Sequence, residues 1–211
     1  MLQAIGSLTL AAALGAGGSQ PARLTAKGEP IPIPPLHGQC QVAFDVAVDE
    51  RGAVTDARFL YGNPSLAKAL EAAVSGWVFE PATEDGEPRS SRVLVAALFR
   101  AAAFYALGSC PPPDHSLLAP PGMPIPAKTS PPAYPVQALG RGVVVVEVEV
   151  GPSGAVRSAR AVGGRTAFDG TAEQAARAWH FLPGRRAGQP VTTLAYLVFG
   201  FPEPVVTVRP E

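Results

Sequence analysis

The sequence has few of the residues that build metal centres and disulfide scaffolds. Its 211 residues include two cysteines and three histidines, too few for an all-cysteine zinc site or a dense disulfide framework. Charge is also scarce, because charged residues make up 16% of the chain against about 25% in typical soluble proteins. The 17 basic and 17 acidic residues balance, so no global field favours binding to nucleic acid or to a membrane.

Signatures of catalysis and of metal binding are missing as well. The segment 151–154 (GPSG) is one residue too short after its serine for a nucleophile elbow, and a hairpin is predicted there. His37, His115 and His180 belong to no metal-ligand motif with another histidine, a cysteine pair or a carboxylate. We expect His180 to face solvent. We also expect no enzymatic activity, no cofactor and no metal.

Two other sets of residues have ordinary structural explanations. Asp45, Glu147 and Glu149 alternate with valines, which is typical of a solvated strand face rather than of an acid/base pair. Trp77 and Trp179 could be stacking platforms for a glycan, but their helical phase places them in the core.

Proline and glycine are abundant, with 24 and 22 residues, while the apolar fraction of 47% is high enough to build cores. Ten prolines fall within residues 111–135, and such a segment is typical of extended polyproline. We expect it to be a spacer, with an SH3-type ligand as the alternative. Residues 30–35 form a shorter segment of the same kind.

The amino terminus resembles an export signal. Residues 2–18 are apolar and small, and at about 17 residues they are short for a bilayer span of about 20. A small-residue cleavage zone follows between Ala16 and Ala22, although no basic residue precedes Arg23. We therefore predict an exported protein, with an uncleaved hydrophobic anchor as the alternative.

An internal repeat organises the rest of the chain. At an offset of 102 residues without gaps, 17 of 58 positions are identical between 42–99 and 144–201. Glycine, tryptophan, phenylalanine and proline keep their spacing over this length, which indicates a tandem duplication.

Each copy has the same predicted order of elements. Every second residue is apolar over 42–48 (valine, with Phe44) and over 144–150 (valine), the period of a strand with one buried face and one face in water. Glycine-containing turns follow at 49–52 and 151–154. A second strand is then predicted at 53–60 and 155–162, and a third at 91–99 and 192–201.

A helix separates the second and third strands. Asn63 and Pro64 have the composition of a helix start, and Thr166 with Asp169 forms a variant capping box. One apolar helical face follows in each copy: Leu66, Leu70, Ala73, Val74 and Trp77 in the first, and Phe168, Ala172, Ala175, Ala176 and Trp179 in the second.

These elements predict an α+β fold of two tandem small β-β-α-β domains. A helical crossover returns the third strand antiparallel to the first, so the simplest three-stranded sheet has the order 2-1-3. One helix covers each sheet, and the third strand is an edge with unpaired backbone groups.

The two cysteines bracket the first copy. In a 2-1-3 sheet the first strand begins where the third ends, so Cys40 and Cys110 can approach within disulfide distance. We predict that they are joined in an oxidising compartment. Two buried free thiols are the alternative.

Several spaced motifs of the second copy resemble a known family. They are 131–135 (PPAYP), the strand that begins at Gly142, 154–156 (GAV), 168–169 (FD), 179–183 (WHFLP) and 188–191 (GQPV). In this order they resemble the carboxy-terminal domain of the TonB energy-transducer family, over about 132–202. The first copy is similar more weakly, over 36–100, and lacks the Tyr-Pro entry.

The resemblance implies a periplasmic, non-enzymatic domain whose edge strand captures an extended segment of an outer-membrane receptor. An inner-membrane motor complex would energise it. The expected partner-binding edge is Thr192, Thr193, Leu194, Ala195, Tyr196, Leu197, Val198 and Phe199. The rival hypothesis is a structural envelope protein whose third strands pair with each other or in a homodimer. No nucleic-acid partner is expected.

The predicted organisation has five parts. They are a signal-like segment at 1–22, a Pro-rich entry at 23–35, a degenerate TonB-like domain at 36–110, a Pro-rich linker at 111–131 and a second TonB-like domain at 132–211.

Overall fold

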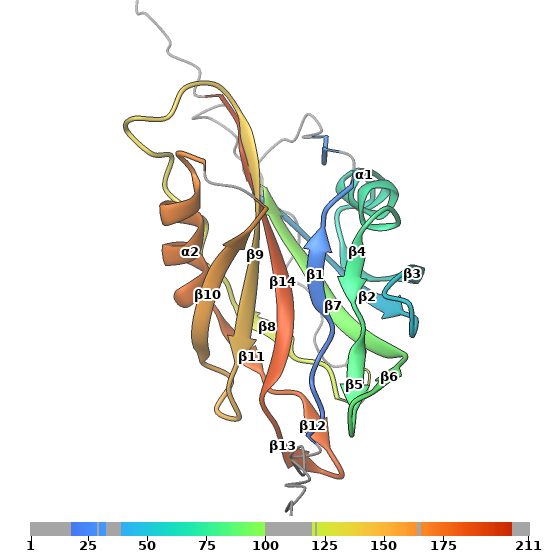
Figure 1. Ribbon diagram of the computed structural model, residues 1–211. Helices are drawn as coiled ribbons and strands as arrows, with labels where there is room; N and C mark the ends of the chain where they lie inside the picture. The colour runs from blue at the N-terminus through green and yellow to red at the C-terminus, as the bar shows by residue number, and fades with distance from the viewer. Residues whose placement is uncertain are drawn as a thin grey trace, which may run out of the picture.

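A computed structural model describes residues 18–28, 30–32, 39–99, 120, 122–163 and 166–203. Its centre is one six-stranded sheet of order β10-β9-β14-β7-β2-β3 (Figure 1). The six strands are β2 (Cys40–Val48), β3 (Val54–Gly62), β7 (Ser91–Phe99), β9 (Gly142–Val150), β10 (Val156–Val162) and β14 (Thr193–Phe201).

Two helices and four short strand pairs complete the described part of the chain. The helices are α1 (Pro64–Val74) and α2 (Asp169–Arg177). The pairs are β1 (Arg23–Ala26) with β4 (Val78–Glu80), β5 (Ala82–Glu84) with β6 (Glu87–Arg89), β8 (Ile125–Lys128) with β11 (His180–Leu182), and β12 (Arg185–Arg186) with β13 (Gln189–Pro190). The fold is mixed, with mostly strands, as an α+β class requires.

The predicted order 2-1-3 occurs on both sides of the sheet. In the first half, residues up to 99, β2 lies between β3 and β7; in the second half, from residue 120, β9 lies between β10 and β14. All four of these pairings are antiparallel. The expectation of two separate three-stranded sheets is wrong, because β7 and β14 pair in parallel and join the halves.

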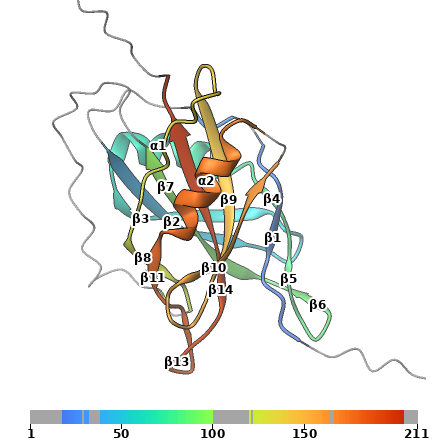
Figure 2. The ribbon, with the colours of Figure 1, turned by 90° about the vertical axis from the view of Figure 1, so that its left-hand side faces the viewer.

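Because β7 and β14 pair in parallel, equivalent faces of the two halves lie on opposite sides of the sheet. Packing two equivalent strands side by side in parallel relates them by a two-fold axis along the strands, which exchanges the faces of the sheet. The helix α1 therefore covers one face and α2 the other (Figures 1 and 2). The core on each face contains strands of both halves: Tyr196 belongs to the α1 face, and Leu94 to the α2 face.

Local signals position α1 as predicted, whereas α2 begins at Asp169 with Phe168 and not Thr166 as its N-cap. The side chain of Asn63 accepts a hydrogen bond from the Leu66 amide at 3.0 Å, and Pro64 begins α1. Before α2, the Thr166 amide donates to Asp169 at 3.0 Å. Both predicted apolar helical faces are buried, including Trp77 and Trp179.

Two hairpin glycines show why the repeat keeps this residue. Gly52 and Gly154 have φ values of +83° and +84°, which glycine adopts without strain. A Cβ on either would also lie within 2 Å of the carbonyl oxygen of Phe79 or Phe181. Each glycine carbonyl accepts the amide of that phenylalanine at 2.8 Å. The hairpin is thereby tied to the chain that leaves the helix.

The proline-rich segments are partly strands, which corrects the predicted entry and linker. Within the entry, β1 pairs with β4; within the linker, β8 pairs with β11. The two pairs have the same register and the same bulge at the 102-residue offset. A short strand paired on one side tolerates proline, because the missing amide can face away from its neighbour.

Three predictions concern segments beyond or at the limit of the described residues. Residues 1–17 of the signal-like segment 1–22 and residues 111–119 of the Pro-rich linker 111–131 lie outside them. Cys40 is disulfide-bonded, while Cys110 lies outside the described residues, so the pairing of Cys40 with Cys110 stays a prediction. None of the helices in the described part is long and apolar enough to cross a membrane.

Candidate functional site

The strand expected to be a free edge lies inside the sheet. On one side β14 pairs with β9 from Thr193 to Phe201, and on the other it pairs with β7 from Ala195 to Gly200. Thr192 precedes the strand. The expectation that Thr192–Phe199 forms an edge is therefore wrong for this structure, because β7 occupies the side that was predicted to be open.

The side chains of β14 are as inaccessible as its backbone. The five residues Ala195, Tyr196, Leu197, Val198 and Phe199 are fully buried. A continuous apolar run is typical of a strand with neighbours on both sides and cover on both faces. The third strands contain such an uninterrupted apolar run in the sequence. This run indicates a strand with two neighbours rather than an edge strand.

The junction of β7 and β14, which we call the seam, is nearly symmetric. Leu94 pairs with Ala195, one residue before Tyr196, its counterpart at the 102-residue offset. The parallel ladder continues to Phe99 and Gly200. Close approach is needed at its end, where a Cβ on Gly200 would lie 2.2 Å from the Phe99 ring.

Tyr196 links β14 to the first half through its ring. The ring meets those of Trp77 and Phe79 edge-on, with centroids 6.4 Å and 5.5 Å away. Edge-on aromatic pairs add a favourable quadrupole interaction to the burial of apolar area. The seam is thus fixed by packing on the α1 face as well as by backbone hydrogen bonds.

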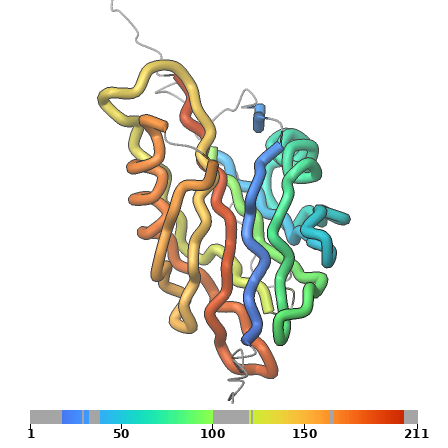
Figure 3. The backbone as a smooth tube through the Cα atoms, viewed as in Figure 1, coloured from blue at the N-terminus to red at the C-terminus, as the bar shows by residue number. Residues whose placement is uncertain are grey.

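The Tyr196 hydroxyl binds the amino-terminal strand. It accepts a hydrogen bond from the Leu24 amide at 2.8 Å. It can donate its proton to the Ala22 carbonyl at 3.2 Å or to Glu147 at 3.1 Å. Burial raises the pKa of Tyr196 well above its usual value. β1 therefore packs over the sheet face that contains Tyr196 and pairs with β4, next to which it runs in the tube view (Figure 3).

Two acidic residues of the sheet are buried, which corrects the prediction of a solvated face. Asp45 is bound by Arg58 at 2.8 Å and by Arg92 at 2.6 Å. The hydrogen bond to Asp45 raises the pKa of Arg92. These carboxylates are buried because other elements cover the sheet face that was predicted to meet water.

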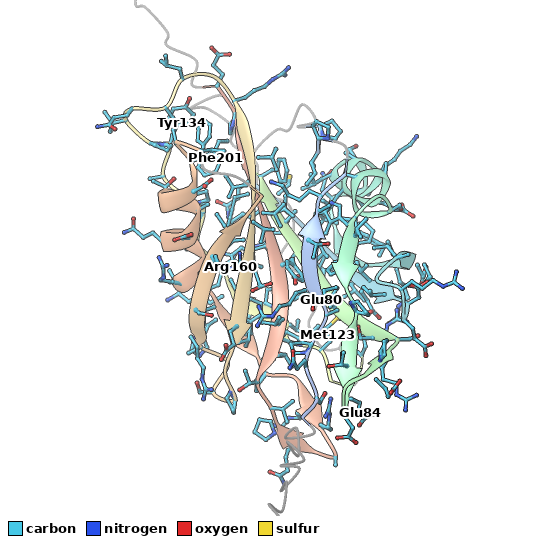
Figure 4. All side chains as sticks on the ribbon, viewed as in Figure 1. Glu80, Glu84, Met123, Tyr134, Arg160 and Phe201 are labelled. Atoms are coloured by element: carbon cyan, nitrogen blue, oxygen red, sulfur yellow. The ribbon has the colours of Figure 1, made fainter. Side chains whose placement is uncertain are left out.

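Glu147 is the counterpart of Asp45 at the 102-residue offset and has the same kind of environment. It contacts Arg23 at 2.6 Å and Arg160 at 3.2 Å; Arg160 is labelled in Figure 4. A buried carboxylate needs such partners to offset its desolvation. These ion pairs are structural, because each of the four arginines links its own strand to the strand that carries the buried carboxylate. Glu149 remains partly exposed and His180 is exposed, as predicted for both.

One outer edge of the sheet is closed by its own helix. On β10, the Ala161 amide donates to Glu173 at 2.9 Å, and the Ala159 carbonyl accepts from Arg177 at 3.0 Å. Both side chains belong to α2. They satisfy the outward-facing backbone groups that another strand would otherwise pair with.

The other outer edge, on β3, has no such closure by the residues that the structure describes. At the 102-residue offset, Glu71 of α1 and Ser75, the residue that caps α1, stand where α2 has Glu173 and Arg177. Ser75 is short, and its hydroxyl donates to the Glu71 carbonyl within the helix. In the part of the chain that the structure describes, no side chain bonds the outward backbone groups of Ala57 and Phe59. Neither outer edge carries a motif in the sequence that marks it as open or closed.

Two cavities and the acidic residues are the places in the described part where a metal or ligand site could lie. A cavity of about 610 Å³ lies against Lys27, Ile31 and Arg141, and one of about 540 Å³ lies at the lower end of the seam. Among the described residues no group of three or more His, Cys, Asp or Glu side chains could hold a metal ion.

One family model matches part of this strand-rich chain. Residues 130–201 match the model of the Gram-negative bacterial TonB protein C-terminal domain. In general that domain is periplasmic, non-enzymatic and interacts with outer-membrane receptors and envelope proteins. The match covers about a third of the chain and includes α2 and β14 but not the first half. No curated protein matches the chain.

Proposed function

We propose that this protein is a non-enzymatic, TonB-type component of the cell envelope, linked to TonB-dependent transport, whose two halves pair their third strands with each other. The observation that carries the proposal is the seam of β7 and β14. In a single three-stranded unit the third strand would be an exposed edge. Here the backbone groups on its open side are paired with the third strand of the other half. The envelope role is supported by the family match and by the signal-like segment 1–22.

The seam is expected to persist in solution. Separating β7 from β14 would break a parallel ladder of six residue pairs. It would also expose Tyr196, which packs between the two halves. Exposing one large aromatic side chain alone costs on the order of 2–3 kcal/mol. An extended receptor segment would therefore have to compete with an intramolecular strand that is already in place.

Capture of an extended receptor segment by Thr192–Phe199 is the second candidate. It is favoured by the match of residues 130–201 to the TonB domain. In this structure it requires that β7 leave β14 first. The two candidates therefore differ in one measurable property, which is the accessibility of the β14 amides.

The experiment is a titration of the isotopically labelled full chain with extended peptides derived from outer-membrane receptors. We expect the amide resonances of Ala195–Gly200 to stay in place and their hydrogen exchange to remain slow. Peptides with proline at alternate positions, which cannot pair as strands, are the control. Saturable shifts confined to Ala195–Gly200, absent with the control peptides, would overturn the seam proposal in favour of receptor capture.

The proposed location is the periplasm, reached through the amino-terminal segment as a cleaved signal or as an anchor. Cell fractionation with mass determination of the mature chain tests it. A chain that begins near residue 22 in the soluble periplasmic fraction supports the signal. A full-length chain in the membrane fraction supports the anchor, and a cytoplasmic chain contradicts export.

A further inference from the structure

The two outer edges of the sheet differ in what they leave unpaired. On β10 the outward groups of Ala159 and Ala161 are bonded by α2 side chains. Their counterparts at the 102-residue offset are Ala57 and Phe59 of β3. Since β3 pairs with β2 over residues 54–59 in the register in which β10 pairs with β9, Ala57 and Phe59 also direct backbone groups outward. Only on β3 are these groups left without a bonding side chain among the described residues.

The side chains of the open edge are exposed and of mixed character. Asp56 and Arg58 have 60% and 57% of their side-chain surface exposed. They are two residues apart and lie on one face of the sheet. On the opposite face, Phe59 is 46% exposed and packs edge-on against Phe44.

We propose that β3 is a dimerisation edge, which pairs antiparallel with β3 of a second copy of this chain. A two-fold axis passes between the two Ala57 residues. The outward backbone groups of each Ala57 then face those of the other. The interface is isologous, as in most homodimers, and the two sheets become one continuous sheet.

The charged side chains of β3 favour this register and a second copy of this chain as the partner. With Ala57 opposite Ala57, Asp56 of each copy lies opposite Arg58 of the other. Opposite charges placed directly across a strand pair are favourable, whereas like charges oppose pairing. Charged residues on an edge normally prevent association. Here Asp56 and Arg58 are spaced so that antiparallel self-pairing places an acidic residue opposite a basic one on both sides of the two-fold axis.

On the other face, the same register brings the exposed Phe59 of each copy to the two ends of the new strand pair. The ladder is centred on residues 56–58, because a bulge displaces Thr55 from the regular alternation of β3. A second copy thus covers the exposed phenylalanine of β3 while it satisfies the backbone. The proposal is independent of the seam, because β3 and β14 lie at different positions in the sheet.

The test is the solution mass of the full chain, measured by light scattering or sedimentation at up to roughly 100 μM, a range that detects micromolar dimers. We expect the wild type to have twice the monomer mass. Ser75→Arg is expected to give a monomer, because it recreates beside Glu71 the pair that closes β10. Asp56→Arg is expected to weaken the dimer by at least tenfold, because it places like charges opposite each other.

Matched controls come from the closed edge. Ser158 is the counterpart of Asp56 on β10 and is exposed, so Ser158→Arg adds the same side chain without touching the proposed interface. It is expected to leave the dimer unchanged, and circular dichroism should show all three variants folded. A monomeric wild type overturns the proposal. A dimer that persists in Asp56→Arg and Ser75→Arg also overturns it, because the interface must then lie elsewhere.

Discussion

The ring of Phe79 meets that of Tyr196 at 5.5 Å and an angle of 76°, although one follows α1 and the other belongs to the last strand of the sheet. Trp77 contacts the same tyrosine. On the α2 face, Leu94 and Leu98 of the first half share a core with Trp179 of the second. The two halves therefore have no separate hydrophobic cores, and their stabilities are coupled.

The first prediction concerns cooperativity. Trp77→Ala and Trp179→Ala each remove a buried side chain and should cost on the order of 3–5 kcal/mol. Because both cores span the seam, calorimetry of the wild type should show one transition, and either substitution should lower it. Two transitions, with only one shifted by each substitution, would instead mean that the halves unfold independently.

The second prediction concerns proline in β14. A free edge would tolerate proline at whichever of Ala195 and Tyr196 has its amide directed outward. Since β14 is paired on both sides, Ala195→Pro and Tyr196→Pro should both destabilise the protein, each by about 3 kcal/mol or more. Ala57→Pro on the open edge of β3 is the control and should cost less. Denaturant titration measures all three; a mild effect at either β14 position would contradict the seam.

The third prediction concerns the Tyr196 hydroxyl. Tyr196→Phe leaves the Leu24 amide without its acceptor and should cost about 1–3 kcal/mol. The loss should appear as faster hydrogen exchange at Leu24, because β1 is held to β14 by this bond. An unchanged exchange rate at Leu24 would show that β1 is held by β4 alone.

The fourth prediction concerns alkaline pH. Burial raises the pKa of Tyr196 and of Tyr61 in the folded protein, so above pH 10 the unfolded chain loses protons that the folded chain keeps. Each tyrosine should then reduce the free energy of unfolding by about 1.4 kcal/mol per pH unit. Chemical denaturation between pH 9 and 11 should show a shallower decline in Tyr196→Phe than in the wild type. Equal slopes would contradict the raised pKa.

The fifth prediction concerns the cysteines. If Cys40 is joined to Cys110, the denatured, unreduced protein should contain no reactive thiol. Closing a loop of about 70 residues stabilises a fold by about 4 kcal/mol in the chain-entropy model, which is an upper estimate. Cys40→Ser should lower the free energy of unfolding by up to that amount and leave one reactive thiol. A titration that finds two thiols in the denatured, unreduced wild type would contradict a disulfide between Cys40 and Cys110.

Several features followed from the sequence alone because their causes are local. The Asn63 cap and the turn at Gly52 depend on neighbouring residues and on backbone angles that few residue types adopt. The order 2-1-3 followed from the period of two, the helical crossover and the 102-residue repeat. The cap and the turn follow short-range rules, and the glycine turn and the period of two occur in both copies.

Tertiary structure alone decided which strand lies beside β14. A period of two says which face of a strand is buried, but it does not say which strand becomes the neighbour. Once β7 and β14 paired in parallel, the halves turned over, and each became covered on the face that had been predicted to meet water. For that reason Asp45 and Glu147 are buried ion-pair centres, and the only open edge among the described strands of the large sheet is β3.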